Sequence, residues 1–324
     1  MENILKIIEK EYGISISNIE QLNIGFDGNT MVYKLLSFDE KTYFLKIRSE
    51  IFCESSLNIP FWLSNNYGIK ELINPIETID KKLYVEKSSQ YIILFPYISG
   101  ISGWDKDLTK EQFIDFGKFM KTLHSAKYPE EYLNSIQIEE YNPKYREMVK
   151  SYLSNLNGQI YSDTIILEFF NALEINQNAI KELLNYLNMA VNNILNDRQT
   201  LCLCHGDIHA GNIFIEKNNF YVVDWDTIIM APKERDLMFI GGGIGDKWNT
   251  KEEISYFYKG YGEETMVNIE LIKYYRCERI IQDIYEFYQE IIGTKYDVEK
   301  RKLCLKHFKS QFEPKNVVEI SLNT

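Results

Sequence analysis

Three side chains within one short segment of the sequence could together transfer a phosphoryl group. The carboxylate of Asp207 could orient a hydroxyl nucleophile and accept its proton. Asn212 and Asp224 offer oxygen atoms of the kind that hold Mg²⁺ beside the phosphates of a nucleotide. All three lie in CHGDIHAGNIFIEKNNFYVVDWD, residues 204–226. This segment is therefore the candidate catalytic centre of the chain.

The spacing of these residues is the most specific feature of the segment. Asp207 and Asn212 are five positions apart, as are the catalytic Asp and the metal-binding Asn of the protein-kinase catalytic loop. Turns rich in Gly, Asp and Asn also flank ordinary hairpins. The joint match of residue type and spacing is much rarer than any one turn dipeptide, so it favours a catalytic loop.

A short hairpin is expected to carry the chain from Asn212 to Asp224. Residues 213–215 and 220–223 are apolar runs of strand length, and the polar residues 217–219 between them are typical of a turn. Asp224 then follows the second strand directly.

The motifs HGDIHAGN (residues 205–212) and VVDWD (residues 222–226) resemble those of the aminoglycoside phosphotransferase and choline kinase family of small-molecule kinases. The run APKERDLMFIGGG, residues 231–243, is most similar to the spectinomycin phosphotransferase branch. The resemblance is strong over residues 203–243, fair over roughly the first hundred residues and loose elsewhere.

This resemblance implies an α+β, protein-kinase-like fold with two lobes. Residues 1–97 would form a nucleotide-binding lobe around an antiparallel sheet. Residues 98–324 would form a mainly helical catalytic and substrate-binding lobe, with a helical insert at about residues 125–200. ATP would bind at the junction of the lobes as the phosphoryl donor, together with Mg²⁺.

The resemblance also implies a role for each motif residue. Asp207 would act on the hydroxyl of the acceptor, and Asn212 and Asp224 would ligate the metal ion. His205 and Asp236 would support the catalytic loop through hydrogen bonds.

Hydrophobic periodicity predicts the elements of the N-terminal lobe. Helical spacing indicates an amphipathic helix over residues 1–12, and three strands are expected at residues 19–24, 31–37 and 42–47. The loop GFDGNT, residues 25–30, joins the first two strands where a kinase covers the phosphates. The loop does not match the G-x-G-x-x-G motif. The assignment of Gly28 to nucleotide binding therefore rests on the position of the loop before the strand that carries Lys46.

Lys46 lies on the third of these strands, between Leu45 and Ile47. A lysine that faces a cleft from such a position needs an anionic partner to offset its desolvation, and ATP phosphates would provide one. A carboxylate near the start of the next helix could hold its ammonium group. Both Glu54 and Glu50 are candidates, and we favour Glu54.

The strand YIILFPY, residues 91–97, is expected to lead out of the N-terminal sheet as a hinge. The resemblance implies that adenine would bond the backbone C=O of Phe95 and the N–H of Tyr97. Pro96 has no N–H and should lie where no donor is needed.

Helices are expected to dominate the rest of the chain. Thr109 is a predicted N-cap for a helix with one aromatic face, and helical patterns follow at residues 179–195 and 251–312. The last of these is rich in acidic residues. We assign Asp226, Glu278 and Asp283 to the cationic groups of an acceptor, although any single acidic residue more often lies on a solvated helix face.

Composition limits the classes of partner. The chain has 324 residues, 45% of them hydrophobic, and a formal net charge of -11. This charge would repel nucleic acid and suits a cationic small molecule, although net acidity also simply keeps proteins soluble. No signal peptide and no membrane-spanning run of roughly 18 apolar residues is evident. The five scattered cysteines are typical of reduced core residues, so we expect a cytoplasmic protein.

The sequence thus predicts an ATP-dependent O-phosphotransferase for a small, polar, cationic molecule, with spectinomycin or a related aminocyclitol as the first candidate and antibiotic resistance as the result. One alternative is a metabolic kinase for choline, ethanolamine, homoserine or methylthioribose, because such enzymes share the phosphate machinery and differ in the acceptor pocket. Another is a kinase-like binding protein without catalysis. The sequence does not indicate the oligomeric state.

Overall fold

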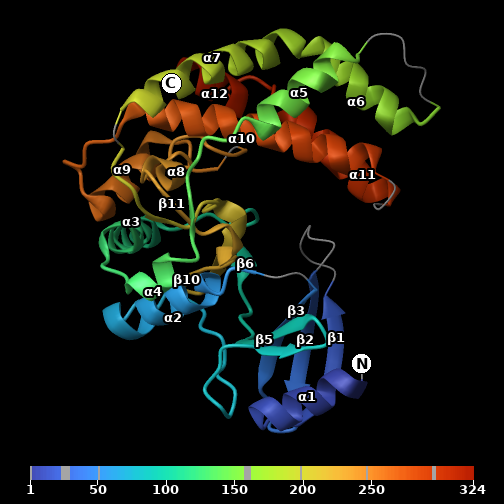
Figure 1. The fold of residues 1–324 in the computed structure, drawn as a ribbon, viewed down its shortest axis with the longest axis vertical. Coiled ribbons are helices and arrows are strands. Elements are labelled where there is room, and N and C mark those ends of the chain that lie inside the picture. Colours follow the sequence, from blue (N-terminus) through green and yellow to red (C-terminus); the bar gives the residue numbers. More distant parts are fainter. Residues whose placement is uncertain are drawn as a thin grey trace. The chain divides into compact units, whose positions relative to one another are not determined.

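The computed structural model describes residues 2–22, 30–49, 52–156, 162–197, 199–245, 247–293 and 297–324, and these form two compact units (Figure 1). Unit 1 comprises residues 1–112, 125–137 and 210–229. Unit 2 comprises residues 113–124, 138–209 and 230–324. Unit 1 therefore includes two segments that follow residue 112 in the sequence, residues 125–137 and 210–229.

Unit 1 contains the antiparallel sheet that the sequence predicts. Its strand order is β1-β2-β3-β5-β4. The strands are β1 (Ile16–Leu22), β2 (Thr30–Ser37), β3 (Thr42–Arg48), β4 (Val85–Lys87) and β5 (Gln90–Pro96). Side chains of β3 alternate between the two faces, so Leu45 and Ile47 are fully buried while Lys46 and Arg48 point to the opposite face.

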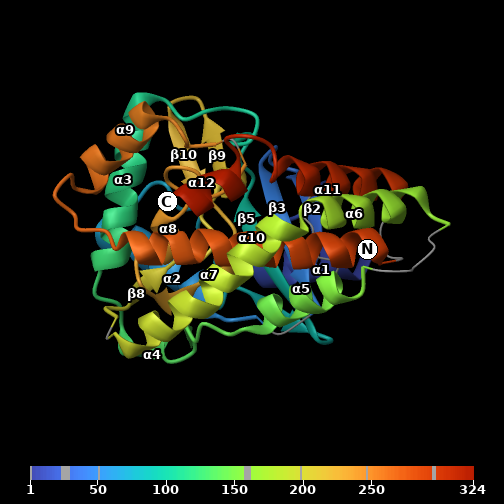
Figure 2. The ribbon, with the colours of Figure 1, turned by 90° about the horizontal axis from the view of Figure 1, so that it is seen from above.

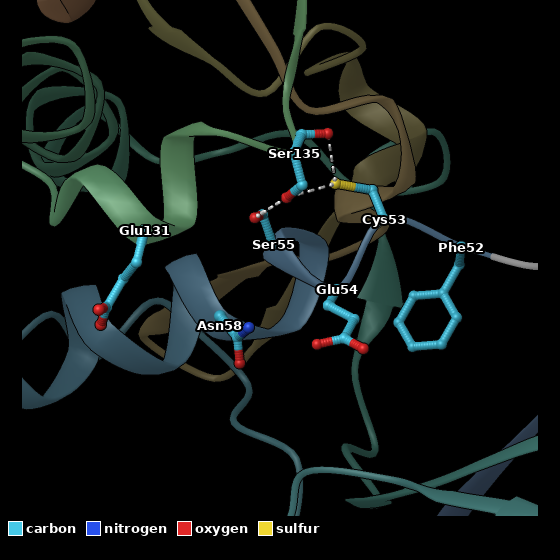
Figure 3. A pocket seen from close by; sticks show the side chains of 7 residues that line it. All are labelled: Phe52, Cys53, Glu54, Ser55, Asn58, Glu131 and Ser135. Atoms are coloured by element: carbon cyan, nitrogen blue, oxygen red, sulfur yellow. Dashed lines mark hydrogen bonds between the residues drawn. The ribbon is translucent and has the colours of Figure 1, made fainter.

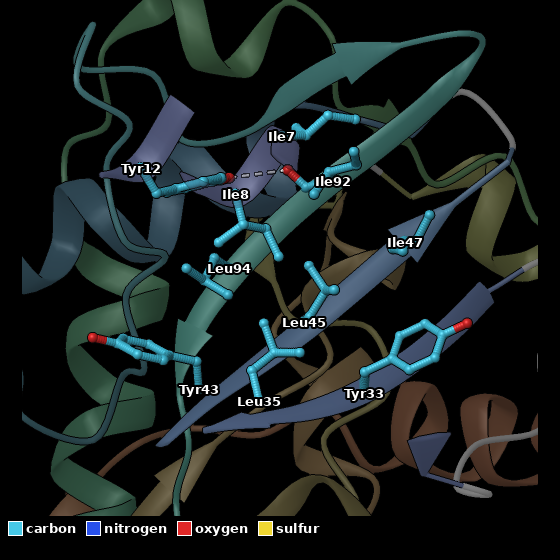
Figure 4. Packing of buried hydrophobic residues seen from close by; sticks show 10 residues of the cluster. All are labelled: Ile7, Ile8, Tyr12, Tyr33, Leu35, Tyr43, Leu45, Ile47, Ile92 and Leu94. Atoms are coloured by element: carbon cyan, nitrogen blue, oxygen red, sulfur yellow. Dashed lines mark hydrogen bonds between the residues drawn. The ribbon is translucent and has the colours of Figure 1, made fainter. Parts of the chain in front are cut away.

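One face of this sheet is covered by α1 (Glu2–Tyr12), and the two form an apolar core (Figure 4). Ile8 from the helix and Leu45 from β3 are both completely buried in it. The hydroxyl group of Tyr12 donates a hydrogen bond to the carbonyl of Ile92, 3.1 Å away. This bond satisfies the polar end of a buried side chain and ties the helix to β5. The packed core therefore fixes the position of β3, the strand that carries Lys46.

A second, smaller sheet explains why residues 210–229 belong to unit 1. Its order is β10-β9-β6, where β9 (Ile213–Glu216) and β10 (Asn219–Val222) form the predicted hairpin and β6 (Ile101–Ser102) pairs with β9. The N–H of Val222 also donates to the carbonyl of Glu71 at 2.8 Å. The hairpin is therefore bonded on both sides to segments from the first half of the chain. The helices of unit 1 beyond α1 are α2 (Ser55–Tyr67) and α4 (Glu130–Leu133).

Unit 2 is mainly helical and is organised around α10 (Ile269–Ile292). Several helices pack along it, as Figures 1 and 2 show. These are α5 (Lys144–Ser154), α6 (Thr164–Ile175), α7 (Gln177–Asn196), α8 (Glu234–Leu237), α11 (Val298–Ser310) and α12 (Val317–Asn323). A short three-stranded sheet has the order β7-β11-β8, where β7 is Gln137–Ile138, β11 is Ile229–Ala231 and β8 is Cys202–Cys204. The loop that carries Asp207 follows β8 directly in the sequence.

The helix predicted from Thr109 is α3 (Lys110–Ser125), and its side chains Phe113, Phe116 and Met120 are buried. It packs closely against α9 (Lys251–Tyr261). A Cβ atom added to Gly260 would lie 1.8 Å from the carbonyl oxygen of Ile114, so no larger residue fits there. The part of the chain that the structure describes contains no helix both long and apolar enough to cross a membrane.

Candidate active site

Asp207 lies on a tight loop that follows β8 in unit 2. Gly206 makes the turn with a φ of 86°, in the left-handed region that favours glycine. The N–H of Asp207 then donates to Nδ1 of His205 at 3.3 Å, and the side chain of His205 is completely buried. Two local features therefore define the conformation of this loop: the left-handed Gly206 and the hydrogen bond from Asp207 to His205.

Asp236 on α8 braces this loop from behind. Its carboxylate accepts hydrogen bonds from the N–H groups of His205 at 2.9 Å and Gly206 at 2.8 Å. Nε2 of His124 lies 3.0 Å from the same carboxylate, while Nδ1 of His124 lies 2.8 Å from the hydroxyl of Tyr261. Burial would raise the pKa of Asp236, but His124 and the donors of the loop outweigh it and lower the pKa. The brace is therefore an ionised, fully bonded carboxylate.

Arg279 contacts the carboxylate of Asp207 directly, and sequence reasoning missed it. Its Nη1 donates to Oδ1 of Asp207, and its Nε donates to Oδ1 of Asp283, 2.7 Å away. Nε2 of His209 lies 3.6 Å from the other oxygen of Asp207. The structure thus places Asp207 in a cluster with both acidic and basic partners.

The charges of this cluster keep Asp207 ionised. Burial would raise the pKa of Asp207, but Arg279 and His209 outweigh it and hold the pKa well below its usual range. A carboxylate that is ionised at neutral pH can accept a hydrogen bond from a hydroxyl group. Asp207 thus has the charge state that a general base needs.

The acidic residues of α10 lie in different surroundings. Asp283 lies one turn after Arg279 and is bonded to it, and its Oδ2 accepts a hydrogen bond from Gln311 at 2.9 Å. Glu278 lies on an adjacent face of the helix, 8% exposed, with an oxygen 3.3 Å from Nε of Arg146. The role of both in acceptor binding stays a prediction, and in this structure each contacts an arginine.

Lys46 is held by an aspartate in unit 1. Its Nζ lies 2.7 Å from Oδ2 of Asp226 and 3.7 Å from Oδ1 of Asp224. Arg48 also pairs with Asp226, at 2.5 Å. Burial would raise the pKa of Asp226, but Lys46 and Arg48 outweigh it and lower the pKa. Asp226, which we expected to bind the acceptor, pairs with the two cations of β3 in this structure.

Glu54 does not pair with Lys46 in the described part of the chain. It precedes the first turn of α2, and its carboxylate accepts a hydrogen bond from the hydroxyl of Tyr84 at 2.5 Å. Figure 3 shows Glu54 at a cavity of about 590 Å³, which Asn58 and Glu131 also line. Its expected partnership with Lys46 is therefore corrected, and Asp226 takes that place. Glu50 and Gly28, the other candidates for the nucleotide site, lie outside the described residues.

The hairpin brings the two predicted metal ligands to one end of β9 and β10. Ile213 pairs with Val222, and the N–H of Val223 donates to the carbonyl of Asn212 at 3.0 Å. Asp224 follows directly, with a left-handed φ of 63° and a side chain that is 54% exposed. Asn212 thus lies opposite Val223, the residue before Asp224. Amide and carboxylate oxygens are hard ligands that suit Mg²⁺.

The backbone groups expected to form the hinge contacts, at Phe95 and Tyr97, belong to the ladder between β3 and β5. The N–H of Tyr97 donates to the carbonyl of Thr42 at 3.2 Å, which continues the ladder between β3 and β5. Hydrogen-bonding residues alternate along an antiparallel strand, so the backbone groups of Phe95 also point toward β3. By the same alternation the C=O of Pro96 faces away from β3.

Comparison with known families identifies the middle of the chain. The sequence model of the phosphotransferase enzyme family (APH) matches residues 70–269, which include both the braced loop and the hairpin. A comparison with curated proteins gave no match.

Comparison with solved structures covers nearly the whole chain. Spectinomycin phosphotransferase APH(9)-Ia in complex with ADP and spectinomycin is 34% identical, with a TM-score of 0.91 over 99% of this chain and 97% of that one. Its AMP-bound complex is likewise 34% identical, with a TM-score of 0.89 over 100% of this chain and 98% of that one. Choline kinase LicA from Streptococcus pneumoniae is 18% identical and has a TM-score of 0.56 over 95% of this chain and 98% of that one. The last likeness shows the fold alone, and together they confirm the α+β, kinase-like fold.

Proposed function

Because the chain belongs to the phosphotransferase enzyme family, in which hydroxyl groups accept the phosphoryl group of ATP, we propose that its acceptor is a cationic aminocyclitol and that spectinomycin is the first substrate to test. The observation that carries this proposal is the ionised carboxylate of Asp207, held on a braced loop five residues before Asn212. The 34% identity to a spectinomycin phosphotransferase over 99% of the chain supports the choice of acceptor.

Asp207 would act on the nucleophile. It would accept a hydrogen bond from the hydroxyl of the acceptor and take its proton as the oxygen attacks the γ-phosphorus. The bond from the γ-phosphorus to the bridging oxygen breaks in the same displacement, and ADP leaves. The loop brace through Asp236 keeps Asp207 in place without reorganisation at the moment of reaction.

Lys46 would hold the phosphates of the nucleotide from the open face of β3. Asp226 keeps its ammonium group oriented, and Arg48 adds a second positive charge on that face. The C=O of Pro96, which faces away from β3, would accept a hydrogen bond from the adenine ring. These groups position the donor and contribute electrostatic stabilisation, which is most of what phosphoryl transfer requires.

Asn212 and Asp224 fit a magnesium ion, because the hairpin register brings two oxygen donors to one end of the strands and the carboxylate of Asp224 is half exposed. A Mg²⁺ ion there would neutralise charge on the phosphates.

A cationic acceptor would be favoured because carboxylates outnumber the guanidinium in the cluster around Arg279. Asp207 and Asp283 together share the single guanidinium of Arg279, and Glu286 lies one turn further along α10 with an exposed side chain. This excess of negative charge would attract the amines of an aminocyclitol.

The test is ADP release by the purified chain with Mg-ATP and each of several acceptors: spectinomycin, choline, ethanolamine, homoserine and methylthioribose. We expect release with spectinomycin, a product heavier by one phosphoryl group, and no release by Asp207→Asn. In cells, the wild-type chain should raise resistance to spectinomycin. Turnover with another member of the panel but not with spectinomycin would refute the antibiotic proposal, and turnover with none would refute catalysis on these acceptors.

A further inference from the structure

A chain of three hydrogen bonds runs from the C-terminal helices of unit 2 to Asp207. Nε2 of Gln311 donates to Oδ2 of Asp283 at 2.9 Å. Oδ1 of Asp283 accepts from Nε of Arg279 at 2.7 Å, and Nη1 of Arg279 donates to Oδ1 of Asp207. Gln311 and Asp283 are 7% and 8% exposed, so the relay is shielded from water for most of its length.

We propose that Arg279 is a positioning residue for the reaction, held by Asp283 and Gln311 so that its guanidinium fixes the orientation of the Asp207 carboxylate. This inference rests on the proposed role of Asp207 as the general base. It assigns a function to Arg279, Asp283 and Gln311 together.

The geometry of Arg279 is suited to this task. A guanidinium presents its donors in a rigid plane, so a bond from Nε to Asp283 fixes the direction in which Nη1 reaches Asp207. Arg279 and Asp283 are four residues apart on α10, so they lie on the same helix face one turn apart. The ring of Phe239 lies 6.0 Å from the guanidinium and packs against it. A side chain constrained on several sides can hold its partner in one rotamer.

Because Arg279 is little exposed, its charge is stable only while its carboxylate partners remain in place. A buried guanidinium is stable only when its charge is balanced, and here two carboxylates balance it. If the arginine rotated away from Asp207, it would lose one of its two carboxylate partners, so the pairing favours one arrangement of both side chains.

The charges in unit 2 that face this relay support the same role. Asp207 faces Arg279, His209 and His205, and all three lower the pKa of Asp207 against the effect of burial. Arg279 faces Asp283 and Glu286 from its own helix, and both interactions favour its charged form. Removing the guanidinium charge should therefore raise the pKa of Asp207, whereas moving the charge without removing it should not.

Two substitutions of Arg279 separate position from charge. Arg279→Met keeps an apolar stem and removes the charge, so kcat with spectinomycin should fall by about tenfold to a hundredfold, less than the loss of the base itself. In a plot of kcat against pH, the fall on the acidic side should shift to higher pH by about one unit or more. KM for ATP should change by less than about twofold. Arg279→Lys keeps the charge but lacks the planar fork, so kcat should decrease while the acidic side of this plot stays near that of the wild type.

Asp283→Asn tests the relay in a protein that retains Arg279. This variant should also lower kcat. The double variant Arg279→Met with Asp283→Asn should be no slower than Arg279→Met alone, because the two residues act in series. Additive losses would overturn the relay. Arg301→Met is the matched control, because Arg301 is also little exposed and pairs with Asp163 of unit 2. It should change stability without moving the pH profile.

The outcomes separate this inference from the proposed function. If Asp207→Asn is inactive but Arg279→Met has the kcat and pH profile of the wild type, Asp207 remains the base and the role of Arg279 is refuted. If Asp207→Asn turns over at the wild-type rate, the proposed function itself is refuted. Should Arg279→Met not fold, the comparison of Arg279→Lys with Asp283→Asn decides, because a positioning role requires both to lower kcat.

Discussion

The ammonium group of Lys46 lies 2.7 Å from Oδ2 of Asp226, although the two residues are 180 positions apart in the sequence. The contact exists because the β9–β10 hairpin belongs to the same unit as the N-terminal sheet. It joins the residue that would hold the phosphates to the DWD motif that ends the hairpin. The nucleotide side of the proposed site is therefore assembled within unit 1.

Replacing Lys46 with alanine should impair the use of ATP without unfolding the chain. A hydrogen bond to a charged group contributes about 1.5–3 kcal/mol, so kcat/KM for ATP should fall by about tenfold to a hundredfold or more. Steady-state ADP release at varied ATP concentrations measures this. Because the side chain of Lys46 lies on the face opposite the apolar core, thermal unfolding should change little.

Asp226→Asn is the matched variant for Lys46→Ala. It keeps the shape of the partner and removes its charge, so it should lower kcat/KM less than Lys46→Ala does. A larger effect from Asp226→Asn would contradict the assignment of Asp226 as an anchor and indicate that it contacts the metal ion.

Replacing Asp224 with alanine should abolish the response to magnesium. The substitution removes a half-exposed carboxylate at the end of the hairpin and leaves Asn212 as the remaining ligand of the pair. Turnover should collapse at ordinary Mg²⁺ concentrations and recover in part at high concentrations. A Mg²⁺ titration of ADP release, with calorimetric binding of Mg-ADP, tests this, and binding of spectinomycin alone should survive. Normal turnover at low Mg²⁺ would show that Asp224 is not a ligand.

Local pattern predicted those parts of the fold that depend on neighbours in sequence. Alternating apolar residues predicted β3 and the side of it that Lys46 occupies, and the polar turn at residues 217–219 predicted the hairpin. The register of that hairpin then follows from strand pairing, and it brings Asn212 beside Val223. The catalytic, metal-binding and nucleotide roles assigned to Asp207, Asn212, Asp224 and Lys46 remain predictions for the experiments above.

Contacts between distant segments could not be predicted in the same way. Arg279 is one charged residue on a long helix, and nothing near it in sequence indicates that Asp207 lies at its side chain, 72 residues earlier. Glu54 precedes a helix as expected, but Tyr84 supplies its partner. The sequence also did not indicate that the ladder between β3 and β5 continues to Tyr97, whose N–H donates to the carbonyl of Thr42.

Replacing Gly260 with alanine should destabilise unit 2. Alanine favours a helix by about 1 kcal/mol over glycine, but the added Cβ would lie 1.8 Å from the carbonyl oxygen of Ile114. Overpacking costs typically 1–3 kcal/mol, and here two helix backbones must separate, so we expect a loss of about 3 kcal/mol or more. Denaturant unfolding measures it. The neighbouring exposed Lys259→Ala should change stability by less than about 0.5 kcal/mol, and equal effects of the two variants would contradict close packing of α3 and α9.

Glu278 should make the protein less stable as the pH rises from about 5 to 8. Burial raises its pKa from 4.5 to about 7, against the opposing effects of Arg146 and Arg235. Between these two values the folded state retains a proton that the unfolded state has released, so the free energy of unfolding falls as the pH rises through the window. The contribution is at most about 3–4 kcal/mol over the full window from 4.5 to about 7, at 1.36 kcal/mol for each pKa unit.

Glu278→Gln removes this titration while keeping the size of the side chain. Thermal unfolding at pH 5, 6, 7 and 8 should therefore show a smaller loss of stability with rising pH in the variant than in the wild type. Glu264→Gln, at an exposed position, should follow the wild-type curve. If Glu278→Gln also followed it, Glu278 would be ionised throughout the range, and its pairing with Arg146 would have to outweigh its burial.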